Sequence, residues 1–254
     1  MITRKELEAV GRALGFNAYQ AEKDYLQHAF LAVLYSVSAD EYVFKGGTAL
    51  QKGYGLNRFS EDLDFTFNGA GEASKLIGRA ATALGDFTET TLTKREAARE
   101  SLSFRLKLKG PLYNGTERSL QTVVLEVSLR EKVLHAPSAR RIVPPYADLR
   151  PYVALCMSLD EILSEKVRAI LTREKPRDVY DAWFLLRKNA VFSKEMADSK
   201  LAYYGMRFER TAFEKALGRK QRLWDKELKA LLKNPPPFNE TVSELLQLMR
   251  TQGL

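Results

Sequence analysis

The stretch 42–67, YVFKGGTALQKGYGLNRFSEDLDFTF, constrains this chain more than any other. An apolar run leads into Gly46 and Gly47, a short segment of helical character follows, and a strand then carries Asp62 and Asp64. Side chains two apart on a strand point to the same face of a sheet. The two aspartates therefore share one face, and the apolar residues that alternate with them can face a core.

Two neighbouring carboxylates repel each other unless a cation lies between them. Mg²⁺, or Mn²⁺ in its place, suits Asp62 and Asp64, since Mg²⁺ takes oxygen ligands and is usually held by one or two carboxylates plus substrate phosphates. Glycines allow close backbone approach, and a helix N-terminus offers free N–H groups to phosphate. The stretch thus favours a metal–nucleotide site in which Gly46, Gly47 and Thr48 contact phosphate. The alternative is a tight turn followed by a surface strand with two solvated acids.

The string KGGTALQKGYGLNRFSEDLDF resembles the first motif of the AbiEii/AbiGii-type toxin nucleotidyltransferases, which include MenT-like toxins. These proteins are part of the DNA polymerase beta-like nucleotidyltransferase superfamily, whose pattern is Gly-Ser or Gly-Thr, a spacer, and Asp-x-Asp. Thr48 stands where many members have Ser. The resemblance implies an α+β fold: a small mixed sheet carries the site, flanking helices pack on it, and a C-terminal helical lobe closes the active-site cleft.

A chain of 254 residues can form one large domain or two lobes. We expect N-terminal helices plus a nucleotidyltransferase core over 1–155 and a helical lobe over 156–254. The chain has no apolar run near the roughly 20 residues that span a membrane, and the N-terminus lacks the apolar core of a signal peptide. The cytoplasm is therefore the expected location. The single cysteine, Cys156, excludes an intramolecular disulfide framework and a CxxC zinc site.

The N-terminal region predicts two helices. The first covers 3–14, where Thr3 and Glu6 have the spacing of a capping box, and the second covers about 18–38 with Asn17 as its cap. The string Glu22-Lys23-Asp24-Tyr25 opens the second helix, and an exposed polar first turn is the simplest interpretation of it. A similar string often occurs at this point in the AbiEii-type family.

The middle of the chain predicts a helix over 72–84 and two long strands, at about 101–109 and 119–129, that form a hairpin. Glu126 lies in the second strand among apolar residues, where burial of an unpaired acid is costly. The resemblance implies that it is the third metal-binding carboxylate. The alternative is an exposed acid on an edge strand, paired with Arg105 or Lys107. The proline-rich stretch 135–151 predicts a surface loop or linker.

The C-terminal third predicts helices. Ser158 and Glu161 have capping-box spacing, and Lys166 falls on an apolar helical stripe, from which a lysine either snorkels to water or points into a polar site. Pro176 suits the first turn of the next helix. Asp178 and Asp181 follow it there and can simply complement the helix dipole.

The pattern Glu-Lys, a gap, then Arg-Asp-x-Tyr-Asp resembles the downstream motif of the same toxin family. The resemblance implies that Lys166 contacts nucleotide phosphates and that Asp181 is required for activity. It extends more weakly to Arg177, as a cofactor-binding residue, to Arg173 and to Asp178. The choice between Asp178 and Asp181 stays open.

The overall charge favours a polyanionic partner, because the chain carries a formal net charge of +8. Residues 207–233 contain nine Lys or Arg against four acids, which is either a solvated helix surface or a face that guides RNA or an acidic antitoxin. We therefore expect a metal-dependent nucleotidyltransferase that transfers an NMP from an NTP to an acceptor. The resemblance implies an RNA acceptor, in particular the 3′ end of tRNA, and a toxin of a type IV toxin–antitoxin or abortive-infection pair. The alternatives are a protein acceptor or a non-catalytic RNA- or nucleotide-binding protein.

Overall fold

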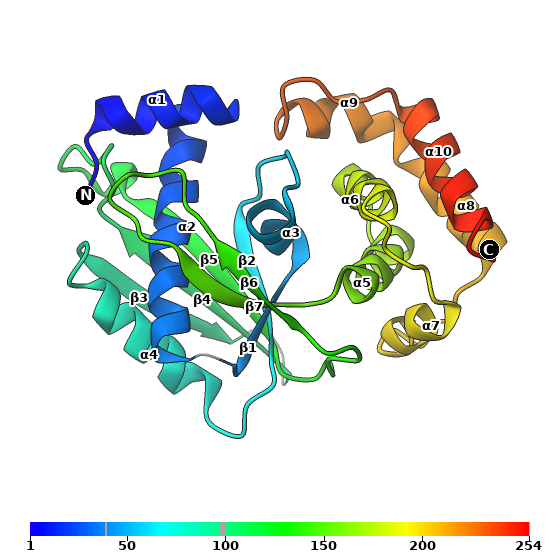
Figure 1. Ribbon diagram of the computed structural model, residues 1–254, viewed down its shortest axis with the longest axis horizontal. Helices are drawn as coiled ribbons and strands as arrows, with labels where there is room; N and C mark the ends of the chain where they lie inside the picture. The colour runs from blue at the N-terminus through cyan, green and yellow to red at the C-terminus, as the bar shows by residue number, and fades with distance from the viewer. Residues whose placement is uncertain (39, 97–99, 254) are drawn as a thin grey trace. The chain divides into compact units, whose positions relative to one another are not determined.

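The computed structural model describes residues 1–38, 40–96 and 100–253, and the chain divides into two compact units (Figure 1). Unit 1 comprises Met1–Val133 and Pro137–Met157, whereas unit 2 comprises Leu134–Ala136 and Ser158–Leu254. The main crossing from unit 1 to unit 2 therefore falls between Met157 and Ser158. The short excursion of Leu134–Ala136 into unit 2 is a feature that the sequence does not predict.

Unit 1 contains the sheet and four helices among the described residues. Its elements are α1 (Arg4–Leu14), α2 (Ala18–Val37), β1 (Tyr42–Lys45), α3 (Gly46–Tyr54), β2 (Asp62–Phe67), α4 (Ala73–Leu84), β3 (Thr90–Glu96), β4 (Ser101–Leu108), the 3₁₀ turn η1 (Glu117–Ser119), β5 (Gln121–Ser128), β6 (Ser138–Ile142) and β7 (Tyr152–Cys156). Unit 2 contains helices α5 (Leu159–Thr172), α6 (Pro176–Arg187), α7 (Lys194–Ala202), α8 (Arg210–Arg219), α9 (Gln221–Lys229) and α10 (Phe238–Arg250).

The sheet has seven strands in the order β3-β4-β5-β2-β1-β7-β6. Strand β2 pairs antiparallel with β1 and parallel with β5, so the strand of the Asp-x-Asp motif lies at the centre of a mixed sheet. Strands β4 and β5 pair antiparallel, as the predicted hairpin requires. The expected α+β fold, with a mixed sheet and flanking helices, is confirmed.

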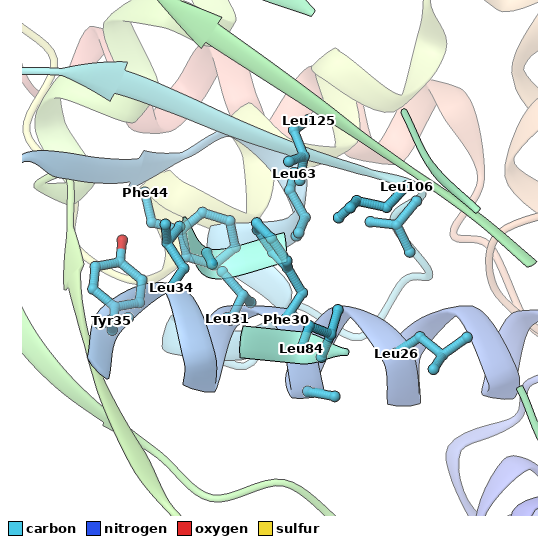
Figure 2. Close-up of a cluster of buried hydrophobic side chains, with 14 of the residues drawn as sticks. Leu26, Phe30, Leu31, Leu34, Tyr35, Phe44, Leu63, Leu84, Leu106 and Leu125 are labelled. Atoms are coloured by element: carbon cyan, nitrogen blue, oxygen red, sulfur yellow. The ribbon is translucent and has the colours of Figure 1, made fainter. Parts of the chain in front are cut away.

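The main core of unit 1 lies between α2 and one face of this sheet (Figure 2). Leu63 of β2 and Leu125 of β5 point toward Phe30 and Leu31 of α2, and all four side chains are fully buried. The period of two along β2 therefore works as predicted: its apolar residues face α2. The aspartates of the same strand project from the opposite face of the sheet.

The two N-terminal helices begin as predicted. At α1, the Thr3 hydroxyl accepts the Glu6 N–H while the Glu6 carboxylate accepts the Thr3 N–H, and Asn17 and Gln20 make the equivalent reciprocal pair at α2. Each such cap stabilises a helix by about 1 kcal/mol because it satisfies N–H groups that have no partner within the helix. Gly15 ends α1 with φ of 74°, a conformation that glycine adopts without strain.

The prediction of an exposed polar first turn in α2 is wrong. Glu22, Lys23 and Asp24 are all buried. Glu22 accepts the N–H of Leu112 at 2.6 Å, and Asp24 accepts the ammonium of Lys52 at 2.7 Å. The charges of Glu22 and Asp24 are tolerated inside unit 1 because partners from distant parts of the chain satisfy them.

Three strands were absent from the sequence-based assignment. The stretch 135–151 is not only a loop, since Ser138–Ile142 forms β6 and pairs antiparallel with β7. The third missing strand, β3, pairs with β4. Strands β3 and β6 are the two edges of the sheet. An edge strand buries less of its surface than a central one, and four of the five residues of β6 are exposed, so it lacks a clear apolar alternation.

In unit 2, the predicted cap of α5 is half correct. The Ser158 hydroxyl accepts the Glu161 N–H, but the Glu161 carboxylate accepts the N–H groups of Leu134 and His135 and the ammonium of Lys200. The Glu161 side chain, which was expected to complete the capping box, instead binds the backbone of the Leu134–Ala136 excursion within unit 2. Pro176 occupies the first turn of α6, as predicted.

No helix in the described part of the chain is long and apolar enough to cross a membrane.

Candidate active site

The carboxylates of the Asp-x-Asp motif belong to a polar row across the centre of the sheet. Asp64 of β2 is the register partner of Lys45 on β1 and of Glu126 on β5. Ser103 on β4 is in turn the partner of Glu126. Register partners on neighbouring strands lie about 4.8 Å apart and project to the same face. Asp62, two residues before Asp64, shares that face.

The glycine turn lies directly against one of these carboxylates. Gly46 has φ of 71°, and a Cβ added there would lie 2.4 Å from an Oδ atom of Asp64. Only glycine permits this approach at this backbone conformation. Helix α3 begins at Gly46, so the free N–H groups of its first turn open next to Asp64.

Two residues that the sequence analysis did not select lie at the same turn. A Cβ on Gly47 would lie 2.3 Å from a guanidinium nitrogen of Arg58 and 2.9 Å from the hydroxyl of Ser60. Arg58 is only 2% exposed, so its positive charge is held beneath the glycine turn. A signal for both existed: polar residues at 58, 60, 62 and 64 continue the alternation of β2 upstream of the strand.

Thr48 lies one residue beyond the glycines and is fully buried. Its hydroxyl donates to the backbone carbonyl of Asp62. The Thr48 side chain thus links α3 to the start of β2. In the first turn of the helix, Thr48 therefore offers its backbone N–H rather than its hydroxyl. The assignment of Thr48 to phosphate stays a prediction that concerns this N–H.

Glu126 is not an edge-strand acid, because β5 lies between β4 and β2. Its carboxylate accepts the Ser103 hydroxyl at 2.8 Å and is half-buried. The alternative of an exposed acid that pairs with Arg105 or Lys107 is therefore wrong: Lys107 pairs with Glu117 at 2.6 Å. Arg105 is exposed on the same face of the sheet, in register with Val124.

The donor set on this face fits a divalent cation of the Mg²⁺ type. Asp62, Asp64 and Glu126 supply only carboxylate oxygens, which Mg²⁺ prefers. The side chains do not form a closed metal cage in the part of the chain that the structure describes, where no three His, Cys, Asp or Glu side chains gather closely enough to hold a metal ion. An open arrangement is compatible with Mg²⁺, which usually keeps several ligand positions for water and substrate phosphates.

In unit 2, the residues of the downstream motif form one ionic cluster. The Lys166 ammonium lies 3.0 Å from Asp178 and 2.7 Å from Asp181. Arg173 donates twice to Asp178, each time at 2.7 Å. Lys166 is 6% exposed, so of the two alternatives for a lysine on this stripe, the one in which it snorkels to water is wrong. The two aspartates do more than complement a helix dipole, because they face a buried lysine.

The cluster keeps Asp178 ionised. Burial alone would raise the pKa of its carboxyl group, but Lys166 and Arg173 outweigh this and hold the pKa well below its usual range. Arg177, which the sequence assigns to the cofactor, is half-buried on α6 beside Asp178. Asp178 is thus held by both Lys166 and Arg173.

The remaining candidates have ordinary structural surroundings. Cys156 is buried, and burial raises the pKa of its thiol to about 12, as expected of an inert packed cysteine. The His28 imidazole lies 2.9 Å from the Tyr152 hydroxyl, and His135 is exposed.

The family described as "Nucleotidyl transferase AbiEii toxin, Type IV TA system" matches residues 30–247 of the chain. The chain belongs to this family. The match includes both the Asp-x-Asp face of unit 1 and the ionic cluster of unit 2. Membership makes this AbiEii protein a nucleotidyltransferase-type toxin of a type IV toxin–antitoxin system, as the resemblance of its motifs indicated. A comparison with curated proteins gives no match.

Solved structures support the same fold for this AbiEii protein. JHP933 from Helicobacter pylori is 24% identical and superimposes with a TM-score of 0.61, over 92% of this chain and 93% of that one. MenT4, a nucleotidyltransferase toxin from Mycobacterium tuberculosis H37Rv, is 16% identical and superimposes with a TM-score of 0.66, over 100% of this chain and 89% of that one. At these identities the likeness concerns the fold alone.

Proposed function

We propose that this AbiEii protein transfers an NMP from an NTP to an acceptor hydroxyl in a metal-dependent reaction that releases pyrophosphate. The observation that carries the proposal is the sheet register that brings Asp62, Asp64 and Glu126 to one face, with the glycine turn against Asp64. Paired carboxylates beside a helix N-terminus suit a substrate that combines a divalent cation with phosphate groups.

The residues of unit 1 have separate tasks in this reaction. Asp62 and Asp64, with Glu126, would hold Mg²⁺ or Mn²⁺, which when bound neutralises the triphosphate and lowers the pKa of the attacking hydroxyl. The N–H groups of Gly46, Gly47 and Thr48 would bind phosphate oxygens, and Arg58 adds positive charge behind them. The acceptor oxygen bonds to the α-phosphorus, the bond from that phosphorus to the bridging oxygen breaks, the hydroxyl proton is released, and pyrophosphate leaves.

Lys166 and Asp181 are proposed to act on the same nucleotide, and this part rests on the downstream motif of the family. Lys166 would neutralise charge on the leaving pyrophosphate, and Arg177 would contact the nucleotide. The proximity of Lys166 to Asp62 and Asp64 stays a prediction. A photoreactive NTP analogue that labels peptides of both β2 and α5 would support it, whereas labelling of β2 alone would contradict it.

RNA, in particular the 3′ end of tRNA, is the acceptor that we propose. The net charge of +8 and the basic segment 207–233 support a polyanion, and the toxin family supports a target whose modification stops growth. The cognate antitoxin is the proposed protein partner. A protein acceptor is the second candidate, since surface shape selects the acceptor in either case.

The test is incubation of the protein with Mg²⁺, each labelled NTP and total tRNA, followed by mass measurement of the RNA. We expect one added nucleotide with wild type and a rate at least about 10³-fold lower for Asp62→Asn and Asp64→Asn, because a metal ligand is lost. Asp86→Asn, which changes an exposed acid of the same unit, is the matched control and should react at the wild-type rate.

Three outcomes separate the candidates. Label in protein rather than RNA favours the second acceptor class. Binding of RNA without turnover, equal in wild type and Asp64→Asn, indicates a non-catalytic binding protein. Equal transfer by wild type and Asp64→Asn contradicts the assignment of the site.

A further inference from the structure

The polar side chains of α2 form a network that reaches both halves of the unit 1 site. Asp24 accepts hydrogen bonds from Gln51 at 2.9 Å and from Lys52 at 2.7 Å through the same oxygen, and from the Tyr146 hydroxyl at 2.9 Å through the other. Gln51 and Lys52 belong to α3, the helix that starts at the glycine turn. Asp24 therefore fixes the helix whose first turn faces Asp64.

Gln51 also holds the segment that leads into the Asp-x-Asp strand. Its side-chain oxygen accepts the backbone N–H of Ser60 at 3.0 Å. A carboxylate only accepts hydrogen bonds. Asp24 must therefore bind the NH₂ end of the Gln51 amide, and this leaves the oxygen end for Ser60. The charge of Asp24 thus sets which way the Gln51 side chain faces.

Gln27, one turn after Asp24 on α2, binds backbone carbonyl groups of the same segment. Its NH₂ group donates to the carbonyl of Ser60 at 3.1 Å and to that of Glu61 at 2.8 Å. Thr48 donates to the next carbonyl, that of Asp62. The backbone of three consecutive residues, 60–62, is thus held by side chains of α2 and α3.

The electrostatics of the network favour a fixed geometry. Asp24 and Lys52 are fully enclosed; burial alone would raise the pKa of Asp24, but the charge of Lys52 outweighs this and keeps the carboxyl ionised. Removal of either charge would leave the other buried without its partner, which is strongly unfavourable. The network therefore has one stable arrangement over the pH range in which both groups are charged.

We infer that Asp24, Gln27 and Gln51 are positioning residues, which set Asp62 and Asp64 against the glycine turn by holding the backbone of 60–62. They touch no substrate atoms in this scheme. The inference gives the buried charge of Asp24 a role, and it rests on the proposed function. Misplacement of reacting groups by about 1 Å can lower a rate about 100-fold, so a network at this point has a direct effect on turnover.

Gln51→Met and Gln27→Met are the informative variants, because methionine keeps the size of glutamine and removes its hydrogen bonds. Asp24→Asn is less suitable, since it leaves Lys52 buried without a counter-ion. The matched control is Tyr35→Phe, which removes a buried hydroxyl from the far end of α2, where it donates to the carbonyls of Tyr42 at 2.9 Å and Leu155 at 3.3 Å.

The first measurement is hydrogen exchange of the backbone amides in the nucleotide-free protein. In Gln51→Met, the Ser60 amide should exchange about fivefold faster or more, because its acceptor is lost. In Tyr35→Phe, its exchange should stay at the wild-type rate. Equal exchange of Ser60 in Gln51→Met and in the control overturns the inference, whatever the activity of the protein.

The second measurement is NMP transfer per folded molecule. We expect kcat to fall about 10- to 100-fold in Gln51→Met and Gln27→Met while the NTP KM changes less than about threefold. Tyr35→Phe should keep the wild-type kcat. If kcat in Gln51→Met and Gln27→Met equals that of Tyr35→Phe, the inference is overturned. If wild type transfers nothing to any acceptor, the proposed function fails, and the exchange of Ser60 still decides whether the network positions this segment.

Discussion

Glu126 is the single residue that most directly tests a third carboxylate in the metal site. Glu126→Gln keeps a side-chain oxygen that can accept the Ser103 hydroxyl, so the fold should be unchanged. The amide is a weaker ligand for a hard cation. We expect the Mg²⁺ concentration for half-maximal transfer to rise about 10- to 100-fold, as measured by metal titration of the rate.

The control for Glu126 is Ser103→Ala, which removes the hydrogen bond and keeps the carboxylate. A smaller change in the metal requirement is expected, because the ligand remains. If the metal requirement is unchanged in Glu126→Gln, Glu126 is not a metal ligand. Asp62 and Asp64 would then be the proposed protein ligands of the metal.

His28 makes stability depend on pH. Burial, followed by the charge of Lys52, lowers the pKa of its imidazole to about 3, well below the 6.5 of an unperturbed histidine. Between these values the unfolded chain binds more protons than the folded protein, so the free energy of unfolding falls as the pH drops from about 6.5 toward 3. The slope from this one group is at most about 1.4 kcal/mol per pH unit.

Urea unfolding at several pH values measures that slope. His28→Gln should flatten it, whereas His135→Gln should not, since His135 is exposed. A wild-type curve that is flat between pH 6 and 4 would mean that His28 accepts a proton without leaving its site.

At the scale of elements, α6 offers a way to decide between its two aspartates. Asp178 is braced by Arg173 and Lys166, so Asp178→Asn should lower the free energy of unfolding by about 3 kcal/mol, the usual cost of breaking a buried ion pair. Asp181 is also buried and lies 2.7 Å from Lys166, so Asp181→Asn should destabilise the fold as well, but it should in addition lower the rate of NMP transfer per folded molecule. Chemical unfolding and transfer assays on both variants check this, and the reverse pattern would assign the functional role to Asp178.

The elements that the sequence predicts well are those whose signal is local. The alternation along β2 identifies both of its faces, and the reciprocal pairs at Thr3 and Asn17 mark the starts of α1 and α2. The missed strands β3 and β6 are edges of the sheet, where half-exposed backbone tolerates polar residues. No local rule identifies them, because their pairing depends on β4 and β7.

The candidate site is predictable to a similar degree. The spacing of Asp62 and Asp64 predicts a metal-binding face, and the family motif adds Lys166 and Asp181 as candidates, and the roles of all four stay predictions. The contacts of Asp24 and Gln27 were not predictable, because their partners lie 27 or more residues away and a charged first turn is usually solvated. Residues that satisfy each other across the fold carry no signature in sequence spacing.

At the scale of the whole molecule, the excess of positive charge predicts a salt-dependent acceptor step. Transfer to tRNA should fall at least about tenfold between roughly 50 and 200 mM salt, because phosphate contacts release counterions. Arg222→Glu combined with Lys226→Glu, both exposed on α9, should reduce the slope of log(kcat/KM) against log salt. Lys5→Glu combined with Arg12→Glu, both exposed on α1, changes the net charge by the same amount and is the control for net charge alone. A slope that is unchanged by the α9 pair would exclude this segment from RNA contact.

The excursion of Leu134–Ala136 affects whether the gene can be divided into two parts that each encode one complete unit. Because these three residues leave unit 1 and the chain then returns to it until Met157, the two units are joined by three chain crossings rather than one. A fragment beginning at Ser158 would lack the amides that Glu161 accepts, and a fragment ending at Met157 would carry them without their acceptor. Recombination at this boundary would therefore produce two incomplete halves, so the units are expected to be inherited together.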